Sequence, residues 1–462
     1  MNLLKARSID ATEGNLLPKI LLYAFPLILS TLIQQLFNAV DIMVLGNMAD
    51  EVAVASVTAT SSIVSLFVNS FVGLASGSRV VLARQIGAKD HERVRKTTDT
   101  SLILAVGIGI AVAAICFFAS PWFLDLTNCP PECRDEALLY VRIYAMAAPF
   151  IMLYNFGSSA VTASGDTQRP LYYIIIGGAA NVVLNVVLCL ILPQKVIAVA
   201  IATAVSQIIS AALISRRLIK MDGPCRVVIR KMRFCGKALG DILRFGLPML
   251  LTNAIFPISN LQIQSAINSF GVAATAGNGA ASTIESIISS TSAPFGTTVA
   301  TFVGQNIGAQ KPDRVKKSFY DVLIVTVLIC ATISVAAFLT GEFWLGLIVG
   351  KENQTAITYG LIRMSCTTLF YVIAGVNNVY GGALQAHGYS TFSAINSIFC
   401  VLIFRTIWMQ TVYVNCSGLE DNRRFFMVVV CFTVAWAIRM VANVVGFAFV
   451  RMKYNRGFRR VL

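Results

Sequence analysis

Residues 84–96 read RQIGAKDHERVRK, and a similar stretch, GQNIGAQKPDRVKK, occupies residues 304–317. Ile86, Gly87, Ala88, Arg93 and Val94 of the first stretch recur 221 positions later in the second. The same or nearly the same offset makes three further pairs, which are Arg142 with Arg363, Pro26 with Pro248 and Gly165 with Gly388. The recurrence predicts a chain built from two related halves.

Each half consists of long apolar runs between short polar breaks. The chain is 56% hydrophobic and 13% charged, whereas soluble domains carry roughly a quarter charged residues. A run of about 20 apolar residues is long enough to cross a bilayer as a helix. Six such runs lie in the first half, near 19–45, 52–77, 98–123, 137–162, 170–192 and 196–218. Six more lie near 241–269, 272–302, 318–340, 357–383, 391–413 and 426–450. The prediction is an all-α membrane protein with twelve transmembrane helices in two pseudo-symmetric six-helix bundles.

The number of helices in each half determines how the halves are related. Because six is even, both bundles enter the membrane in the same sense, as parallel repeats do. We expect an N-terminal lobe at 1–215, a basic cytoplasmic interlobe linker at 216–237 and a C-terminal lobe at 238–462. Two such bundles form an alternating-access carrier when they rock about a shared cleft. No GxxxxGK[ST] loop occurs, so we expect an ion gradient to supply the energy, with Na+ or H+ as coupling ion and no cofactor.

The basic residues predict the orientation, because Lys and Arg favour cytoplasmic loops. With the N-terminus inside, most of the 37 Lys and Arg residues fall in cytoplasmic segments. Five fall on the other side: Arg134, Lys195, Lys351, Arg423 and Arg424. We therefore expect both termini in the cytoplasm. The first fifteen residues are polar and mixed in charge, so we also expect no cleavable signal peptide. The net charge of +15 then reflects topology rather than a nucleic-acid partner.

Two carboxylates, Asp41 and Glu285, stand out within the apolar runs. An ionised side chain at the bilayer centre costs about 2.5–3.5 kcal/mol on insertion scales, so such a residue is a candidate functional group. Asn181 and Asn185 share one helix face, and Thr203 lies at a depth similar to that of Asp41. Carboxylate, amide and hydroxyl oxygens suit Na+, and a carboxylate alone suits a proton. Two structural explanations stay open: a helix cap at Asp41, or asparagines that only bond neighbouring helices.

Prolines and arginines within the runs have both structural and functional explanations. Pro26, Pro248 and Pro257 remove backbone hydrogen bonds where a helix can bend, so they are candidate hinges or static kinks. Arg405 and Arg439 either extend to the membrane surface or line the second lobe, and we favour a structural role.

The cysteines and histidines indicate neither a metal site nor a redox motif. Cys129 and Cys133 share one short loop, where a disulfide and two free thiols are both open. The only histidines, His91 and His387, lie in a loop and at a helix end.

Three segments carry a family resemblance. QQLFNAVDIMVLGNM at 34–48, ISNLQIQSAINSFG at 258–271 and FVGQNIGA at 302–309 resemble the bacterial branches of the multidrug and toxic compound extrusion (MATE) family. The resemblance implies an antiporter in a bacterial plasma membrane that expels amphipathic, often cationic compounds in exchange for Na+ or H+. It covers both halves of the chain.

The resemblance also implies roles for individual residues. Asp41, Asn181 and Thr203 match the acid, asparagine and threonine of the family's cation site, in which Asp41 and Asn181 are candidate Na+ ligands. Asn185 departs from the pattern, because the family usually has an aspartate there, so one negative charge is missing. Glu285 matches a second acid. Three neutral residues of the same motifs complete the predicted substrate or second coupling site, and these are Gln34, Asn260 and Gln264.

The function that these observations favour is export of small molecules by a monomeric antiporter. A flippase for a lipid-linked precursor is the alternative, and it requires cationic residues deep in the cavity. A channel or a membrane enzyme would show a pore-forming repeat or clustered catalytic residues, and neither is visible in the sequence. The substrate, the coupling ion and the oligomeric state stay open at this point.

Overall fold

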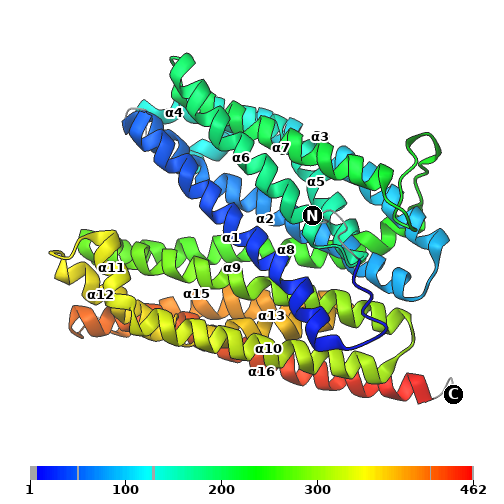
Figure 1. Ribbon diagram of the computed structural model, residues 1–462. Helices are drawn as coiled ribbons and strands as arrows, with labels where there is room; N and C mark the ends of the chain where they lie inside the picture. The colour runs from blue at the N-terminus through cyan, green and yellow to red at the C-terminus, as the bar shows by residue number, and fades with distance from the viewer. Residues whose placement is uncertain (1–7, 49–50, 127–130, 417, 460–462) are drawn as a thin grey trace. The chain divides into compact units, whose positions relative to one another are not determined.

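The computed structural model describes residues 8–48, 51–126, 131–416 and 418–459, and these residues form helices without any strand. The helices of the first half are α1 (Leu16–Met48), α2 (Glu51–Gly87), α3 (His91–Leu126), α4 (Arg134–Met146), α5 (Ala148–Ala163), α6 (Gln168–Ile191) and α7 (Lys195–Lys220). Those of the second half are α8 (Gly236–Asn268), α9 (Val272–Gly308), α10 (Pro312–Leu339), α11 (Gly341–Val349), α12 (Gln354–Cys366), α13 (Tyr371–Ala386), α14 (Ser390–Ser397), α15 (Phe404–Trp408) and α16 (Asp421–Arg459). Figure 1 shows the order of these helices along the chain.

Most of these helices are long and apolar enough to cross a membrane. In the described part of the chain nine helical spans qualify singly, and two bent pairs qualify as further spans. The remaining long helix is α9, which does not qualify because Ser, Thr, Asn and Glu285 interrupt its apolar sequence. When α9 is counted with the nine single spans and the two bent pairs, the spans match the twelve predicted runs in chain order. The all-α membrane fold is confirmed.

Both bent pairs replace a run that the sequence predicts as one straight helix. α4 and α5 meet at 44°, where Pro149 in the first turn of α5 has no amide hydrogen to continue the helix. α12 and α13 meet at 43°. There the carbonyls of Arg363 and Cys366 accept hydrogen bonds from the hydroxyls of Thr367 and Thr433. Hydroxyls that bond helix carbonyls compete with the backbone ladder and bend it.

The predicted repeat is present in the backbone. Lys89 and Gln310, which are 221 residues apart, both have a φ of 55°, the left-handed conformation that ends a helix. The amide of Lys89 bonds the carbonyl of Ile86 at 2.9 Å, and the amide of Gln310 bonds that of Ile307 at 3.1 Å. The two halves therefore share the same helix–turn–helix geometry at the motif that revealed them.

Packing divides the chain into two units, one of residues 1–13 and 25–250 and the other of residues 14–24 and 251–462. The division falls inside α8, whereas the prediction by chain order assigns all of α8 to the second lobe. The start of α8 packs closely on α2, because a Cβ on Gly77 would lie 2.4 Å from the Cα of Gly246. Two glycines at such a crossing let helix backbones approach closely.

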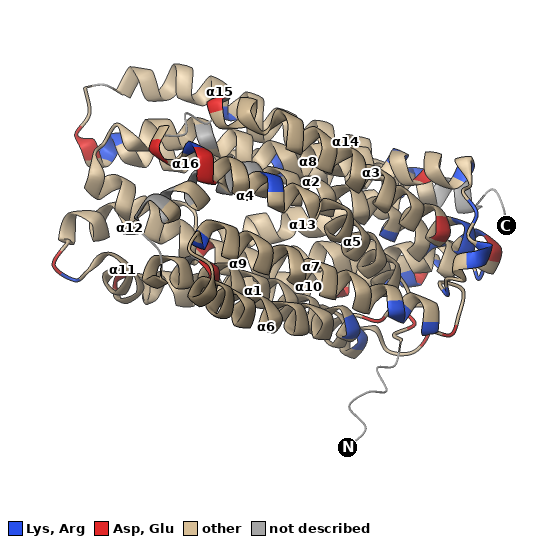
Figure 2. Cartoon of the chain, turned by 90° about the horizontal axis from the view of Figure 1, so that it is seen from above, with Lys and Arg blue, Asp and Glu red and all other residues tan. Residues whose placement is uncertain are grey.

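The surfaces of both units suit a lipid solvent. Large apolar side chains are highly exposed, among them Phe118 at 80% and Leu190 at 70% in the first unit and Leu339 at 76% in the second. In the second unit α10, α13 and α16 lie side by side around Phe319 and Phe447 (Figure 1). Figure 2 shows charged residues gathered toward helix ends, with few along the middle of the helices.

Candidate functional site

The first unit brings together the four residues predicted to form a cation site. Asp41 lies on α1, Asn181 and Asn185 lie one turn apart on α6, and Thr203 lies on α7. The Asn185 amide nitrogen donates to Asp41 Oδ1 at 2.5 Å and to Asn181 Oδ1 at 3.3 Å. The Asn181 amide nitrogen donates to Thr203 Oγ1 at 3.4 Å. A continuous chain of hydrogen bonds thus joins three helices.

Burial gives this cluster its chemical character. Asn185 is fully buried and Asn181 is 4% exposed. Asn185 Oδ1 has no hydrogen-bond donor among the described residues, and a buried acceptor left in that state is costly. Among those residues no group of three or more His, Cys, Asp or Glu side chains is placed to hold a metal ion. The oxygens available near Asp41 are therefore one carboxylate and neutral amide and hydroxyl oxygens, a set that suits a monovalent cation.

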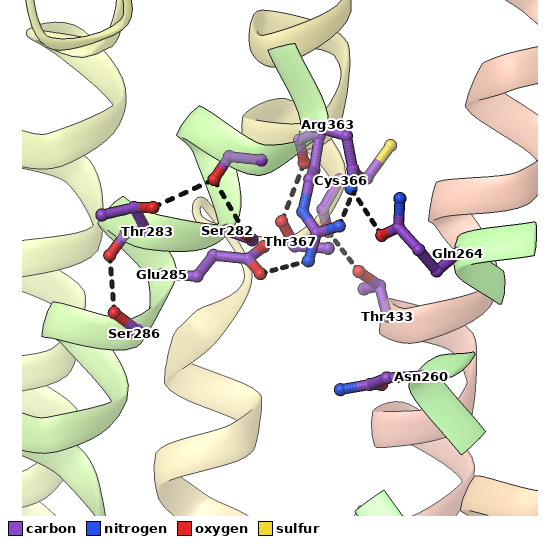
Figure 3. Close-up of polar contacts among 12 residues, drawn as sticks. Asn260, Gln264, Ser282, Thr283, Glu285, Ser286, Arg363, Cys366, Thr367 and Thr433 are labelled. Atoms are coloured by element: carbon purple, nitrogen blue, oxygen red, sulfur yellow. Dashed lines mark hydrogen bonds and ion pairs between the residues drawn. The ribbon is translucent and has the colours of Figure 1, made fainter. Parts of the chain in front are cut away.

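The second unit places Glu285 in an ion pair that the sequence did not reveal. Arg363 Nη2 on α12 lies 2.6 Å from Glu285 Oε2 on α9, and both side chains are largely buried. Arg363 Nη1 donates to Asn278 Oδ1 at 2.5 Å, and the Asn278 amide donates to Gln264 Oε1 at 3.2 Å. Figure 3 shows Glu285 and Arg363 pointing toward each other, with Gln264 on the far side of the arginine. Glu285 thus has a fixed positive partner, whereas no Lys or Arg among the described residues forms a salt bridge with Asp41.

The other residues of the predicted second site are separated. Asn260 on α8 is exposed and accepts a hydrogen bond at 3.2 Å from Arg405, not from the Glu285 pair. Figure 3 likewise shows Asn260 apart from that pair. Gln34 is exposed on α1 in the first unit. The structure therefore joins Gln264 to Glu285 through Asn278 and Arg363, and joins neither Asn260 nor Gln34 to it.

Arg405 and Arg439 are buried, with exposed fractions of 1% and 7%. The sequence left open whether these two side chains extend to the membrane surface or line the second lobe, and their burial argues against extension to the surface. Arg405 lies in a five-residue α-helix, α15, between two π-helical segments at Ile398–Ile403 and Met409–Tyr413. Hydropathy cannot predict the burial of Arg405, because a π-helical turn rotates the following side chains away from the face expected for a regular helix.

The candidate hinges lie close to the points where the chain changes units. Pro26 is inside α1, two residues after Ala24, and Pro248 lies in α8 two residues before Leu250. Pro257 lies further along α8. Cys133 is buried, and Cys129 lies outside the described residues, so their pairing stays open. His387 Nδ1 contacts the Ala383 carbonyl at 2.8 Å.

Comparison with known proteins identifies the class of transporter. The sequence profile of the MatE family matches residues 26–191 and 248–408, one segment in each half. The chain therefore belongs to this family of multi-pass membrane transporters, the MATE family that its motifs resemble. It is a transporter and not an enzyme.

Individual relatives agree with this assignment. A Bacillus subtilis protein named "Probable multidrug resistance protein YpnP" is 27% identical over 387 residues, which cover 83% of this chain and 85% of the relative. The "Multidrug export protein MepA" of Staphylococcus saprophyticus is 20% identical over 402 residues, covering 86% and 88%. A solved outward-facing multidrug resistance MATE transporter superposes with a TM-score of 0.87 at 21% identity, covering 98% of this chain and 99% of the other. At that identity the superposition establishes the fold.

Proposed function

We propose that this protein is a secondary antiporter that exports amphipathic, cationic small molecules in exchange for Na+ or H+ by alternating access. It works as a monomer in a bacterial plasma membrane, with both termini in the cytoplasm. The observation that carries the proposal is the contact between Asp41 and Asn185 beside a buried, unpaired amide oxygen. The names of the multidrug relatives support export as the direction of transport.

Asp41 is the group through which the two fluxes are coupled. An ionised carboxylate in a largely apolar helix bundle needs a cation, and Na+, H+ and a cationic substrate each meet that need. Asn185 holds one carboxylate oxygen through its amide nitrogen and offers its own unpaired oxygen to the same cation. Since one carboxylate neutralises one charge, binding of the ion and of the substrate exclude each other. Mutual exclusion at one site is sufficient for exchange.

Pro26 and Pro248 provide bending points for the conformational change. Both lie within two residues of the division between the packing units, inside helices that run continuously through it. A helix that loses a hydrogen bond at proline bends more readily than a regular one. Hinges at these two positions let the units move while α1 and α8 stay helical.

Glu285 has a secondary place in this proposal. Its pairing with Arg363 at 2.6 Å already neutralises its charge, so a second cation gains less there than at Asp41. Release of Glu285 from Arg363 is required before it takes part in coupling. The missing negative charge at Asn185 is therefore not replaced by a free carboxylate at Glu285.

The test of the proposed function is transport by purified protein in liposomes. Ethidium movement is followed by fluorescence with a Na+ gradient, a pH gradient and no gradient imposed in turn. Acceleration by only one gradient identifies the coupling ion. Folded protein that moves no ethidium under any gradient would refute cation export.

One observation favours a second candidate, a flippase for a lipid-linked precursor. Arg405 and Arg439 are buried cations within the second unit, the type of residue that binds a pyrophosphate. Translocation of a fluorescent polyprenyl diphosphate in the same liposomes tests it. Flipping without ethidium transport would replace the exporter by this second candidate.

A further inference from the structure

One face of α8 carries three residues that lie beside three buried arginines. Phe256, Asn260 and Gln264 are spaced four residues apart, which places them in one stripe along the helix, with about 6 Å between neighbours. Arg439 lies over the Phe256 ring at 5.4 Å. Arg405 donates to Asn260 at 3.2 Å. Asn278 donates a hydrogen bond to Gln264 and accepts one from the third arginine, Arg363, so it connects the stripe to that arginine.

The three arginines come from three helices of the second unit, and two of them share an aromatic neighbour. Arg363 lies on α12, Arg405 on α15 and Arg439 on α16. The guanidinium carbons of Arg363 and Arg405 lie 5.1 and 4.4 Å from the centre of the same ring, Phe432. We call this set of three the arginine ladder. Each member is at most 7% exposed.

The ladder has a surplus of positive charge. Glu285 lies within 4 Å of Arg363, and among the described residues no carboxylate lies that close to Arg405 or Arg439. The Arg405 hydrogen bonds go to neutral oxygens of Ser259 and Asn260, at 3.3 and 3.2 Å. Aromatic rings stabilise a cation less than an anion does. Among the described residues, therefore, neither Arg405 nor Arg439 forms an ion pair with a carboxylate.

Unused hydrogen-bond donors at Arg405 and Arg439 are available to an anion. The Nε atoms of Arg405 and Arg439 are buried and have no acceptor among the described residues. Ser259, which accepts from Arg405, donates its own hydrogen to the Val401 carbonyl at 2.7 Å, in the π-helical segment. That bond fixes Ser259 as an acceptor and orients the guanidinium. Asn260 is exposed and forms the open edge of the cluster.

We propose that Arg405 and Arg439 form a binding site for a small anion, either the carboxylate of a transported molecule or a free halide. A guanidinium presents paired N–H donors that match a carboxylate, and the site supplies two guanidiniums without a competing acid. The proposal goes beyond the proposed function, because the Asp41 site binds cations and lies in the other unit. A carrier with both sites accepts acids and zwitterions in addition to cations.

The test is binding of [14C]benzoate to the full-length protein in nanodiscs, measured by scintillation proximity at constant ionic strength. Benzamide is the neutral competitor of the same shape. The variants are Arg405→Gln, Arg439→Gln and the charge-preserving Arg405→Lys. Arg142→Gln is the matched control, because Arg142 also lies over an aromatic ring, at 4.9 Å from the centre of Phe117, but in the first unit.

Benzoate is expected to bind to the wild type and to Arg142→Gln, and about tenfold or more weakly to each glutamine variant, since a charge-assisted bond is lost. Arg405→Lys keeps the charge but loses the paired donors, so it should bind benzoate more weakly than the wild type and more tightly than Arg405→Gln. Displacement by chloride identifies a free halide as the occupant, whereas displacement only by carboxylates identifies the acid of a transported molecule. Binding that is equal in all variants, or that benzamide displaces as well as benzoate does, would overturn the proposal.

Thermal unfolding distinguishes an anion-binding role of Arg439 from a purely structural role, and the measurement does not require transport. Arg439→Gln removes an unpaired buried charge, so without anions its midpoint should equal or exceed that of the wild type. Added benzoate should raise the midpoint of the wild type and leave that of Arg439→Gln unchanged. A lower midpoint for Arg439→Gln with no benzoate effect on either protein would show a purely structural arginine. Because no gradient is involved, this result is independent of whether the protein exports cations.

Discussion

Neutralising Glu285 is expected to destabilise the second unit strongly. In Glu285→Gln the guanidinium of Arg363 stays buried with a neutral amide and the Phe432 ring as its remaining neighbours. Breaking a buried ion pair from one side costs about 3–5 kcal/mol, because an uncompensated charge is left behind. We expect a loss in this range, since the side chains of the pair are only 8% and 12% exposed.

The assay is unfolding in mixed micelles with increasing SDS, followed by far-ultraviolet circular dichroism. Asp125→Asn is the matched control, because Asp125 and Arg134 are also close, at 2.5 Å, but their side chains are 55% and 42% exposed. An exposed pair contributes about 0–1 kcal/mol. The double variant Glu285→Gln with Arg363→Gln should regain most of the loss, since neither charge is then left buried alone. Equal, small effects of Glu285→Gln and Asp125→Asn would refute this reasoning.

Three further predictions test packing, the cation site and the hinges. Gly77→Ala should destabilise by about 1–3 kcal/mol in the same SDS assay, since its Cβ meets the Gly246 backbone, whereas Gly107→Ala, which has open space, should not. Asn185→Asp should tighten 22Na+ binding to purified protein by adding a second carboxylate, and unchanged binding would argue against Na+ at this site. Pro26→Ala should slow ethidium efflux without destabilising the protein, and an unchanged rate would exclude Pro26 as a hinge.

The sequence predicted those features that depend on position along the chain. The 221-residue offset led to the matching turns at Lys89 and Gln310, because similar local sequences favour similar backbone conformations. Helix periodicity placed Asn181 and Asn185 on one face, and depth along the helices brought Asp41 to the same level. These predictions needed only helix geometry and the thickness of a bilayer.

Features that depend on side-chain partners were beyond the sequence. Hydropathy gives the depth of Arg363 and Arg405 but not the direction in which either side chain points, so neither the Glu285 pair nor the shared Phe432 ring was predicted. The 221-residue offset relates Arg142 to Arg363, but it does not show which residue pairs with Arg363. The π-helical segments around Arg405 have no signal in an apolar run.

Coupling of an ion gradient to export through Asp41 is tested by a single comparison of transport rates. Ethidium efflux from liposomes is measured for the wild type, Asp41→Asn and Asp125→Asn under the gradient that drives the wild type. We expect Asp41→Asn to fold normally but to lose gradient-driven efflux, since its neutral amide cannot exchange one cation for another. Asp125→Asn should keep the wild-type rate. Efflux by Asp41→Asn at the wild-type rate, with the same response to the gradient, would contradict coupling through Asp41.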